Sequence, residues 1–397
     1  MVPLYSRGRL PIRFLVYFAK PSLSYFGNER LLKSFSTAQT RMESRTTDSK
    51  LDRLAKNDRK LQVILELDDL MTHRKRGPYV SLQLMSRWKR MVGLNVEMGR
   101  FVNKYPHIFE VFLHPVKRNL CCRMRKTFKL LIEEENKVMK ESEKESTTRV
   151  KKLLMTSKNY SLHVHALSLI RRQLGLPKDF KNSILGKFRD CFRLNEEDDT
   201  VELVEFEEGL GISKVEEWRR KEYEDKWLSE VETMYAFPLN YPTGYKIKGG
   251  EREKMGNWQR LAYVKPYERK NIPRKNTVGG MKRFEKRIVG LIHEFLSLTV
   301  EKKLEVERFA HFKRDLGFDV NVRELLLRHP GIFYVSTKGR NPVVFLRDGY
   351  SGGCLIETNT VHLVRQKMLH SLLLGNRCTR NLQQEDKAQA NLKLPII

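Results

Sequence analysis

Adjacent carboxylates are the residues of this chain that most resemble a catalytic group, because such acids could bind Mg²⁺ for hydrolysis. The candidates are Asp68-Asp69, the run 133–135 and the run 196–199. Neighbouring acids on a helix or at a hairpin tip diverge, and no flanking pattern would close a coordination shell. A metal-dependent nuclease that needs Asp68 or Glu134 is therefore an alternative hypothesis and not the main one.

The other residue types that carry chemistry lack their usual patterns. The five cysteines include no CxxC pair and no spacing with histidine that would form a tetrahedral zinc site. The motifs of nucleotide hydrolysis (GxxxxGK followed by Ser or Thr), dinucleotide binding (GxGxxG after a strand) and serine acyl transfer (GxSxG) are also missing. We expect no metal, no cofactor and no catalytic residue, and hence no enzyme.

Positive charge is the dominant chemical property of the sequence. Lys and Arg number 76 against 48 Asp and Glu, which gives a formal net charge of +28. Such a surplus predicts attraction to nucleic acid or to anionic lipid. No apolar run reaches the roughly 18 residues of a membrane span, so we expect no span and favour nucleic acid.

Residues 244–287, here called the connector, contain the strongest local nucleic-acid signal. They hold 14 Lys or Arg against 4 Glu, with aromatic residues interleaved. Trp258, Tyr263 and Tyr267 could stack on unpaired bases, worth about 1–3 kcal/mol per base, or pack inside the fold, and the sequence leaves both open. Aromatic residues at apolar-face or strand positions elsewhere are predicted to be core. These are Trp88, Phe109, Phe192 and Phe333.

Basic side chains in the connector and on predicted helix faces are expected to contact phosphates. Each neutralised phosphate releases condensed counterions, and no exact geometry is required. Together with the three connector aromatics, the candidate binding residues are Arg87, Arg90, Arg171, Arg172, Trp258, Tyr263, Tyr267, Arg269, Lys270, Arg274, Lys275, Lys282, Arg283, Lys286 and Arg287.

The elements that must position these residues repeat three times. A glycine after an apolar helical pattern is followed 13 or 14 residues later by Pro or Arg, and an aromatic residue comes three residues after that. The pattern predicts a helix, a tight turn, a second helix and a β-hairpin. We therefore predict an α+β, predominantly helical fold of tandem helix-turn-helix plus β-hairpin modules that resemble winged helices. The paired positions are Gly93 with Pro106, Gly175 with Arg189, and Gly317 with Pro330.

The predicted modules cover about residues 50–120, 150–210 and 281–350. Between the first two, residues 125–155 alternate Lys and Glu and predict a long solvated helix. Residues 376–397 are polar and predicted to be disordered.

The N-terminal segment, residues 1–45, has the composition of an organellar transit peptide. It is basic and rich in Ser and Thr, and Glu29 is the only acid among its first 42 residues. Its arginines and aromatic clusters favour a mitochondrial over a chloroplast presequence. We therefore expect import into mitochondria, with the chloroplast as the alternative, and exclude this segment from the fold.

Several separate motifs follow one another between about residues 50 and 375. They include Phe101-Val102-Asn103-Lys104-Tyr105-Pro106-His107-Ile108-Phe109-Glu110, Leu174-Gly175-Leu176-Pro177-Lys178-Asp179-Phe180 and Leu327-Arg328-His329-Pro330-Gly331-Ile332-Phe333-Tyr334-Val335. In these motifs and their order the sequence resembles a known family, the plant organelle RNA recognition (PORR) domain proteins. One departure is the run Gly186-Lys187-Phe188-Arg189, which stands where the family tends to have a proline before the aromatic.

The resemblance implies a nucleus-encoded protein imported into a plant organelle. It further implies binding to group II intron RNA and promotion of its splicing, with the intron as the ribozyme and other splicing factors as partners. No base-contacting residues carry over from the family. Two further alternatives stay open. One is a duplex-DNA-binding factor, on a loose likeness to the mitochondrial transcription termination factor family, and the other is a structural protein of the ribosome.

Overall fold

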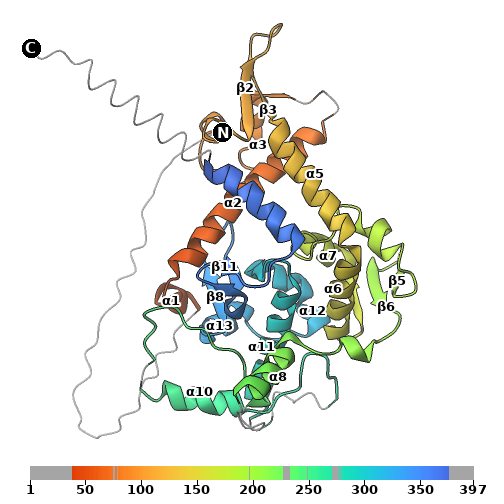
Figure 1. Ribbon diagram of the computed structural model, residues 1–397, viewed down its shortest axis with the longest axis vertical. Helices are drawn as coiled ribbons and strands as arrows, with labels where there is room; N and C mark the ends of the chain where they lie inside the picture. The colour runs from red at the N-terminus through yellow and green to blue at the C-terminus, as the bar shows by residue number, and fades with distance from the viewer. Residues whose placement is uncertain are drawn as a thin grey trace, which may run out of the picture. The chain divides into compact units, whose positions relative to one another are not determined.

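The computed structural model describes residues 38–74, 77, 79–195, 197–226, 233–247, 249–270, 277 and 279–374. This part of the chain is α+β and mostly helical, which confirms the predicted fold class (Figure 1). Its strands form small antiparallel sheets, and in three of them the strand that comes last in the sequence lies between the other two. The orders are β1-β3-β2, β4-β6-β5 and β7-β9-β8.

Each of these sheets belongs to one module with the order strand, helix, turn, helix, hairpin. Module 1 consists of β1 (Val80–Ser81), α3 (Leu82–Trp88), α4 (Met98–Asn103), β2 (Phe109–Leu113) and β3 (Leu120–Met124). Module 2 consists of β4 (Ser161–His163), α7 (Val164–Ile170), the π-helical turn η1 (Lys181–Leu185), β5 (Phe192–Asn195) and β6 (Thr200–Leu203). Module 3 consists of β7 (Lys303–Glu305), the 3-10 helix η3 (Val306–Phe312), α12 (Lys313–Leu316), α13 (Val322–Arg328), β8 (Phe333–Ser336) and β9 (Val343–Leu346).

The predicted layout of helix, turn, helix and hairpin is thus confirmed, but the leading strand of each module was missed. The sequence patterns extended the first helix over Val80, Leu162 and Leu304, which lie in β1, β4 and β7. A strand of two or three residues is too short to show a period of two. It forms because the last hairpin strand offers it unpaired backbone groups.

The repeated glycines all lie in the left-handed region, where a side chain would be strained. Gly317 directly follows α12, whereas Gly93 and Gly175 end the turns that follow α3 and α7. Their φ angles are +64° at Gly93, +75° at Gly175 and +72° at Gly317. In each case the next residue is apolar and its N–H donates to the carbonyl five residues before it, as in a Schellman cap. The three bonds are Leu94 to Lys89 at 2.9 Å, Leu176 to Arg171 at 2.8 Å and Phe318 to Lys313 at 2.9 Å.

The remaining helices connect and cover the modules. Two main apolar cores result: one joins modules 2 and 3 with α11, and the other joins module 1 with α2 and a helix over residues 360–374. The connecting elements are α1 (Ala38–Glu43), α2 (Ser49–Thr72), α5 (Lys126–Glu141), α6 (Glu143–Thr156), η2 (Glu208–Leu210), α8 (Lys214–Lys226), α10 (Glu251–Arg260), α11 (Gly280–Leu298), η4 (Arg347–Gly349), β10 (Tyr350–Ser351) and β11 (Cys354–Leu355).

Packing at the N-terminal side begins before the boundary expected at residue 45. Met42 is buried in the core of modules 2 and 3, and Arg45 Nε donates to the backbone oxygen of Val335 at 2.9 Å. Residues 1–37, which hold most of the predicted transit peptide, and the predicted disordered tail 376–397 lie outside the described residues. The transit peptide therefore stays a prediction.

The segment between modules 1 and 2 corrects the prediction of one long solvated helix. It forms two helices, α5 and α6, which meet at Ser142. Glu135, one of the carboxylates first considered for Mg²⁺, is only 5% exposed. Its charge is neutralised inside the protein, where Arg172 Nη2 lies 3.1 Å from its Oε2 and Arg365 Nε lies 2.6 Å from its Oε1.

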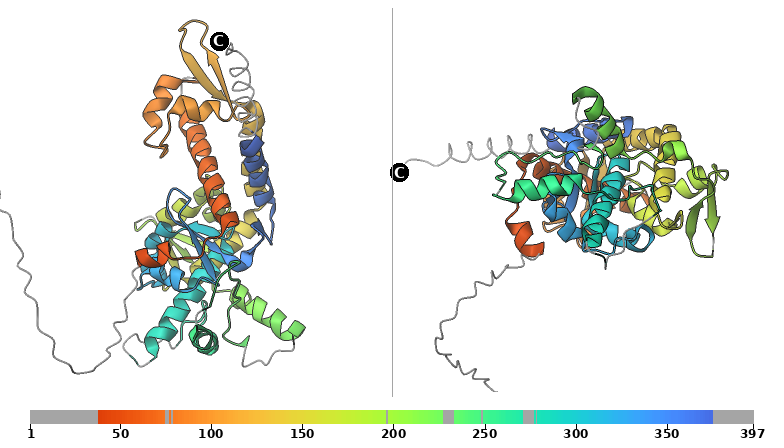
Figure 2. Two further views of the ribbon diagram at one scale, coloured as in Figure 1. Left: turned by 90° about the vertical axis from the view of Figure 1, so that its left-hand side faces the viewer. Right: turned by 90° about the horizontal axis from the view of Figure 1, so that it is seen from below.

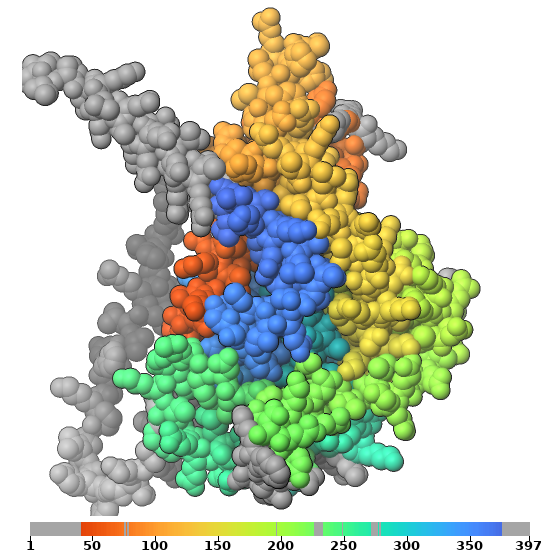
Figure 3. All heavy atoms as spheres, in the orientation of Figure 1, coloured from red at the N-terminus to blue at the C-terminus, as the bar shows by residue number. Residues whose placement is uncertain are grey.

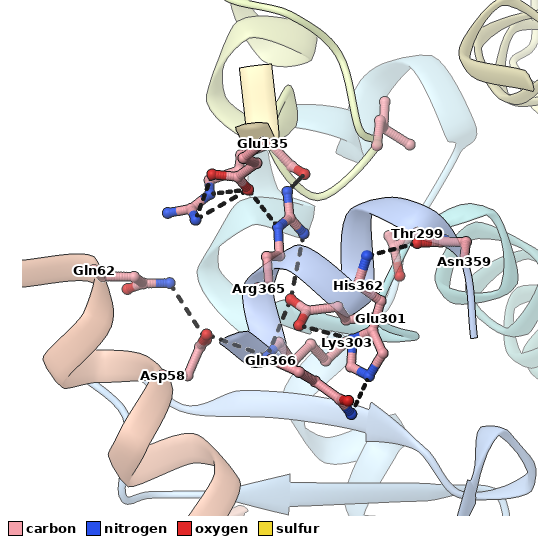
Figure 4. Close-up of polar contacts among 12 residues, drawn as sticks. Asp58, Gln62, Glu135, Thr299, Glu301, Lys303, Asn359, His362, Arg365 and Gln366 are labelled. Carbon is pink, nitrogen blue, oxygen red and sulfur yellow. Dashed lines mark hydrogen bonds and ion pairs between the residues drawn. The ribbon is translucent and has the colours of Figure 1, made fainter. Parts of the chain in front are cut away.

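Arg365, on the helix over residues 360–374, connects the Glu135 carboxylate with modules 2 and 3 (Figure 4). Its Nη2 donates to the backbone oxygen of Arg172, at the end of α7, at 2.7 Å. Its Nη1 lies 3.4 Å from Glu301 Oε2, just before β7, and Lys303 Nζ lies 3.2 Å from the same oxygen. We call Glu135, Arg172, Glu301, Lys303 and Arg365 the junction network.

The junction network predicts a loss of stability in acid. Burial alone would raise the pKa of Glu135, but Arg172 and Arg365 outweigh burial and hold that pKa below its usual value. For Glu301, burial is likewise outweighed, by Lys303, His362 and Arg365. Carboxylates with a lowered pKa stabilise the fold fully above their unfolded value of 4.5, and this contribution disappears as the pH falls through their folded values. The urea midpoint should fall steeply below about pH 4.5.

The variant Glu135→Gln checks this prediction. It removes one of the two titrating groups, so its urea midpoint should change less between pH 5 and pH 3 than that of the parent protein. Equal pH dependence in the two proteins would show that Glu135 does not contribute.

Candidate nucleic-acid interface

The charge of the chain is distributed unequally over its three modules. From the first to the last strand, module 1 has 8 Lys or Arg against 2 acids, module 2 has 7 against 7, and module 3 has 8 against 5. A polyanion is attracted by the local field and not by the net charge of the whole chain. Module 1 is therefore the strongest candidate surface.

Most cations of module 1 are exposed to solvent and pair with no acid among the described residues. Arg87 and Arg90, which the sequence predicted, are exposed at the end of α3 and make no ion pair with the described residues. The same holds for Arg100, Lys104 and Lys117, which were not among the predicted binding residues. A signal for this surface was present, because no acid occurs between Glu110 and Glu133, a stretch with six Lys or Arg.

Arg171 and Arg172 are adjacent in the sequence but differ in what they contact. Arg172 belongs to the junction network, where Glu135 neutralises the charge that was predicted to contact phosphate. Arg171 lines a cleft of about 650 Å³, whose other walls are formed by residues of α2, η3 and the turn between β8 and β9. Other arginines of this cleft are paired: Arg308 lies 3.2 Å from Glu305, and Arg340 lies 3.3 Å from Glu66. With its charges largely balanced, the cleft attracts phosphate less than module 1 does.

The connector, which carried the strongest sequence signal, turns several of its predicted binding residues inward. Lys286 is 0% exposed, and its Nζ donates to the backbone oxygens of Trp258, Gln259 and Leu261 at 2.7, 2.9 and 2.8 Å. These carbonyls lie at the C-terminal end of α10, where a cation satisfies unpaired acceptors. Burial, together with Arg219, lowers the pKa of Lys286 to about 7. Lys286 is thus part of the fold and cannot reach a phosphate.

Arg287 and the connector aromatics have similar structural roles. Arg287 is 7% exposed and donates to the backbone oxygens of Val264 and Lys265 at 3.1 and 2.6 Å. Tyr263 accepts from Arg219 Nη2 at 2.9 Å, and Tyr267 donates to Glu294 Oε1 at 2.7 Å. Both tyrosines are buried, so of the two interpretations left open for them the structure supports packing.

Trp258 also packs, although less completely. Its ring centroid lies 4.6 Å from that of His329 and 5.5 Å from that of Phe237. The core prediction for Phe109, Phe192 and Phe333 is confirmed, since each is 2% exposed, and Trp88 packs against the core around module 1.

The remaining connector candidates fall into three groups. Arg269 donates to the backbone oxygens of Ser157 and Lys158, and its guanidinium lies over the ring of Tyr160. Lys270, Lys282 and Arg283 are exposed and remain available to solvent. Arg274 and Lys275 lie outside the described residues.

Replacing Lys286 by methionine is expected to lower the free energy of unfolding by about 2–3 kcal/mol, because three backbone carbonyls lose their shared hydrogen-bond donor. Lys282→Met, one turn earlier on α11 and exposed, should change stability by less than about 0.5 kcal/mol. Urea unfolding of both variants measures the difference. A stable Lys286→Met protein with weakened RNA binding would restore the original prediction for this residue.

Among the described residues, no group of three His, Cys, Asp or Glu side chains is arranged to hold a metal ion. No helix in that part of the chain is long and apolar enough to cross a membrane.

Repeated winged-helix-like modules, one with a surface of unpaired cations, define a protein of the nucleic-acid-binding class. The sequence matches the family described as "Plant organelle RNA recognition domain" over residues 46–377. The chain therefore belongs to this family, as the resemblance of its motifs predicted, and the nucleic acid concerned is organellar RNA.

Curated relatives carry the similarity over most of the chain. "Protein ROOT PRIMORDIUM DEFECTIVE 1" of Arabidopsis thaliana is 33% identical over 379 residues, which are 92% of this chain and 91% of that protein. "Protein WHAT'S THIS FACTOR 1, chloroplastic" of Zea mays is 28% identical, over 82% of this chain and 66% of that protein. "Protein WHAT'S THIS FACTOR 9, mitochondrial" of Arabidopsis thaliana is 27% identical, over 73% of this chain and 74% of that protein. No solved structure matches the chain.

Proposed function

We propose that this protein binds group II intron RNA in a plant organelle and promotes its splicing without catalysing a reaction itself. The observation that carries the proposal is the surface of module 1, where exposed cations such as Arg87, Arg90 and Arg100 pair with no acid in the described part of the chain. Membership of the RNA recognition family supports RNA over duplex DNA as the polyanion.

The proposed mechanism is electrostatic. A folded intron must pack its helices closely, and its phosphates repel one another there. Cations fixed on a rigid module lower this repulsion and release condensed counterions. The junction network and the two shared cores hold the modules in one arrangement, so the cations act as a preorganised surface. Binding would then favour the folded intron over competing base pairings.

The mitochondrion is the proposed compartment. The support is the composition of residues 1–45, with many arginines and a single acid before residue 43. Relatives named as chloroplastic and as mitochondrial both occur, so the family alone does not select the organelle. A fluorescent protein fused after residue 45 should accumulate in mitochondria, and accumulation in chloroplasts would select the alternative.

The test of the function combines identification of the RNA with competition. Sequencing the RNA that copurifies with the tagged protein from organelles should recover intron-containing transcripts, enriched in group II introns. In a binding assay, unlabelled folded intron should compete better than duplex DNA of equal length, and affinity should fall steeply with salt. Recovery of ribosomal RNA alone, or better competition by duplex DNA, would reject the proposal in favour of a ribosomal or a transcription-related role.

A further inference from the structure

The three hairpins, here called wings 1, 2 and 3 in module order, differ at their tips. The tip of wing 2 is acidic, with Glu197, Asp198 and Asp199 exposed. The tip of wing 3 lies against the rest of the protein, because Arg340 contacts Glu66 and donates to the backbone oxygen of Met91 at 3.4 Å. Neither tip is suited to contact a polyanion.

Wing 1 is both basic and free. In Figures 1 and 2 the hairpin β2–β3 extends beyond the other elements of module 1, and its surface stands clear in Figure 3. At its tip Val116 is 84% exposed, and Leu113 and Leu120 at the base of the turn are 59% and 54% exposed. Lys117 and Arg118 directly follow Val116, are exposed, and make no ion pair with the described residues. Three exposed apolar side chains on one hairpin, beside two unpaired cations, form the kind of patch that marks an interaction site.

The tip is held in one conformation by its own hydrogen bonds. His114 Nδ1 accepts from the N–H groups of Val116 and Lys117 at 3.2 and 3.1 Å, and His114 Nε2 lies 3.0 Å from the hydroxyl of Tyr79. The backbone closes the turn, with the N–H of Arg118 donating to the His114 oxygen at 2.9 Å. A tip ordered before binding loses little conformational entropy on binding.

The chemistry of this tip fits an RNA duplex better than a protein. No acid occurs from residue 111 to residue 132, and Glu110 in β2 is paired with Arg123, so the outer part of the hairpin and the start of α5 attract phosphate. The minor groove of A-form RNA is wide and shallow and displays riboses and base edges, which a narrow hairpin tip can reach. Apolar side chains at such positions press against sugars and base steps in nucleic-acid complexes.

We propose that wing 1 enters the minor groove of an RNA duplex, with Val116 against the ribose and base edges and with Lys117 and Arg118 on the flanking phosphates. This inference rests on the proposed function, because it assigns the part of the protein that contacts structured RNA.

The test uses the full chain and a 30-base-pair RNA hairpin as the probe, with a DNA hairpin of the same sequence for comparison. Val116→Thr should weaken RNA binding about fourfold, the loss expected for one buried methyl group, without changing its salt dependence. Lys117→Ala combined with Arg118→Ala should make the slope of log K against log salt shallower by about 2. Val204→Thr, at an exposed valine just after β6 of wing 2, is the matched control and should bind as the parent does.

The possible outcomes distinguish a failure of the wing 1 proposal from a failure of the proposed function. If the parent protein binds neither the hairpin nor intron RNA, the proposed function fails and the wing proposal fails with it. If the parent binds but the wing 1 variants bind equally well, the wing proposal alone is overturned. If Val116→Asp abolishes binding to phosphatidylcholine–cardiolipin vesicles and leaves RNA binding unchanged, wing 1 docks on a membrane and its assignment to RNA is wrong.

Discussion

Replacing Arg365 by methionine is expected to lower the free energy of unfolding by about 3 kcal/mol. Losing one partner of a buried ion pair costs roughly 3–5 kcal/mol, because the other charge stays buried without compensation. The lower end applies here, since Glu135 keeps Arg172 and Glu301 keeps Lys303 as remaining partners. Urea unfolding followed by circular dichroism measures the effect.

The same helix provides a matched control. Lys367, two residues further on, lies 2.6 Å from Glu134, the neighbour of Glu135 on α5. This pair is largely exposed to solvent, so Lys367→Met should cost no more than about 1 kcal/mol. The two variants remove equal charge from the same helix. If both lower the free energy of unfolding by a similar amount, burial does not increase the contribution of the junction network to stability.

Removing four exposed cations from the helical part of module 1 is expected to change RNA binding most. Alanine at Arg87, Arg90, Arg100 and Lys104 should make the salt slope shallower by about 3, since each phosphate contact contributes about 0.7–0.9. Between 50 and 200 mM salt, the affinity of the parent protein should then fall by a factor roughly 60 times larger than the affinity of the variant. The measurement is a titration of folded intron RNA at several salt concentrations.

A second variant of equal charge distinguishes the two candidate surfaces. Alanine at Lys254, Lys270, Lys282 and Arg283 removes four exposed cations of the connector. If module 1 is the interface, this variant keeps nearly the parent slope. If instead the connector variant has the shallower slope, the interpretation from local composition is right about the surface, although several residues chosen from it are buried.

Much of the fold was predictable from the spacing of a few residue types. Gly93, Gly175 and Gly317 mark where each first helix, or the turn after it, ends, because the left-handed cap has a strong preference for glycine. The apolar residue after each glycine and the aromatic that begins each hairpin follow from the same local geometry. Such features depend on neighbours in the sequence, so a single chain reveals them.

The candidate site was predictable only in part, and the errors share one cause. The sequence shows the high density of positive charge in the connector. It does not show that the side chains of Lys286 and Arg287 point into the fold. That direction depends on carbonyls at the end of α10 and in the loop after it. Likewise, nothing near Glu135 in the sequence shows that Arg365, 230 residues later, lies beside it.

The sequence alone therefore determined the class of fold, the repetition of the module, the excess of positive charge and the family. Only the tertiary structure decided which cations face solvent, why wing 1 is free while wing 3 is seated on α2, and which acids are neutralised inside. The physical reason is that composition and spacing are local properties of the chain. Burial and pairing of a charge are set by segments distant in the sequence that pack against it.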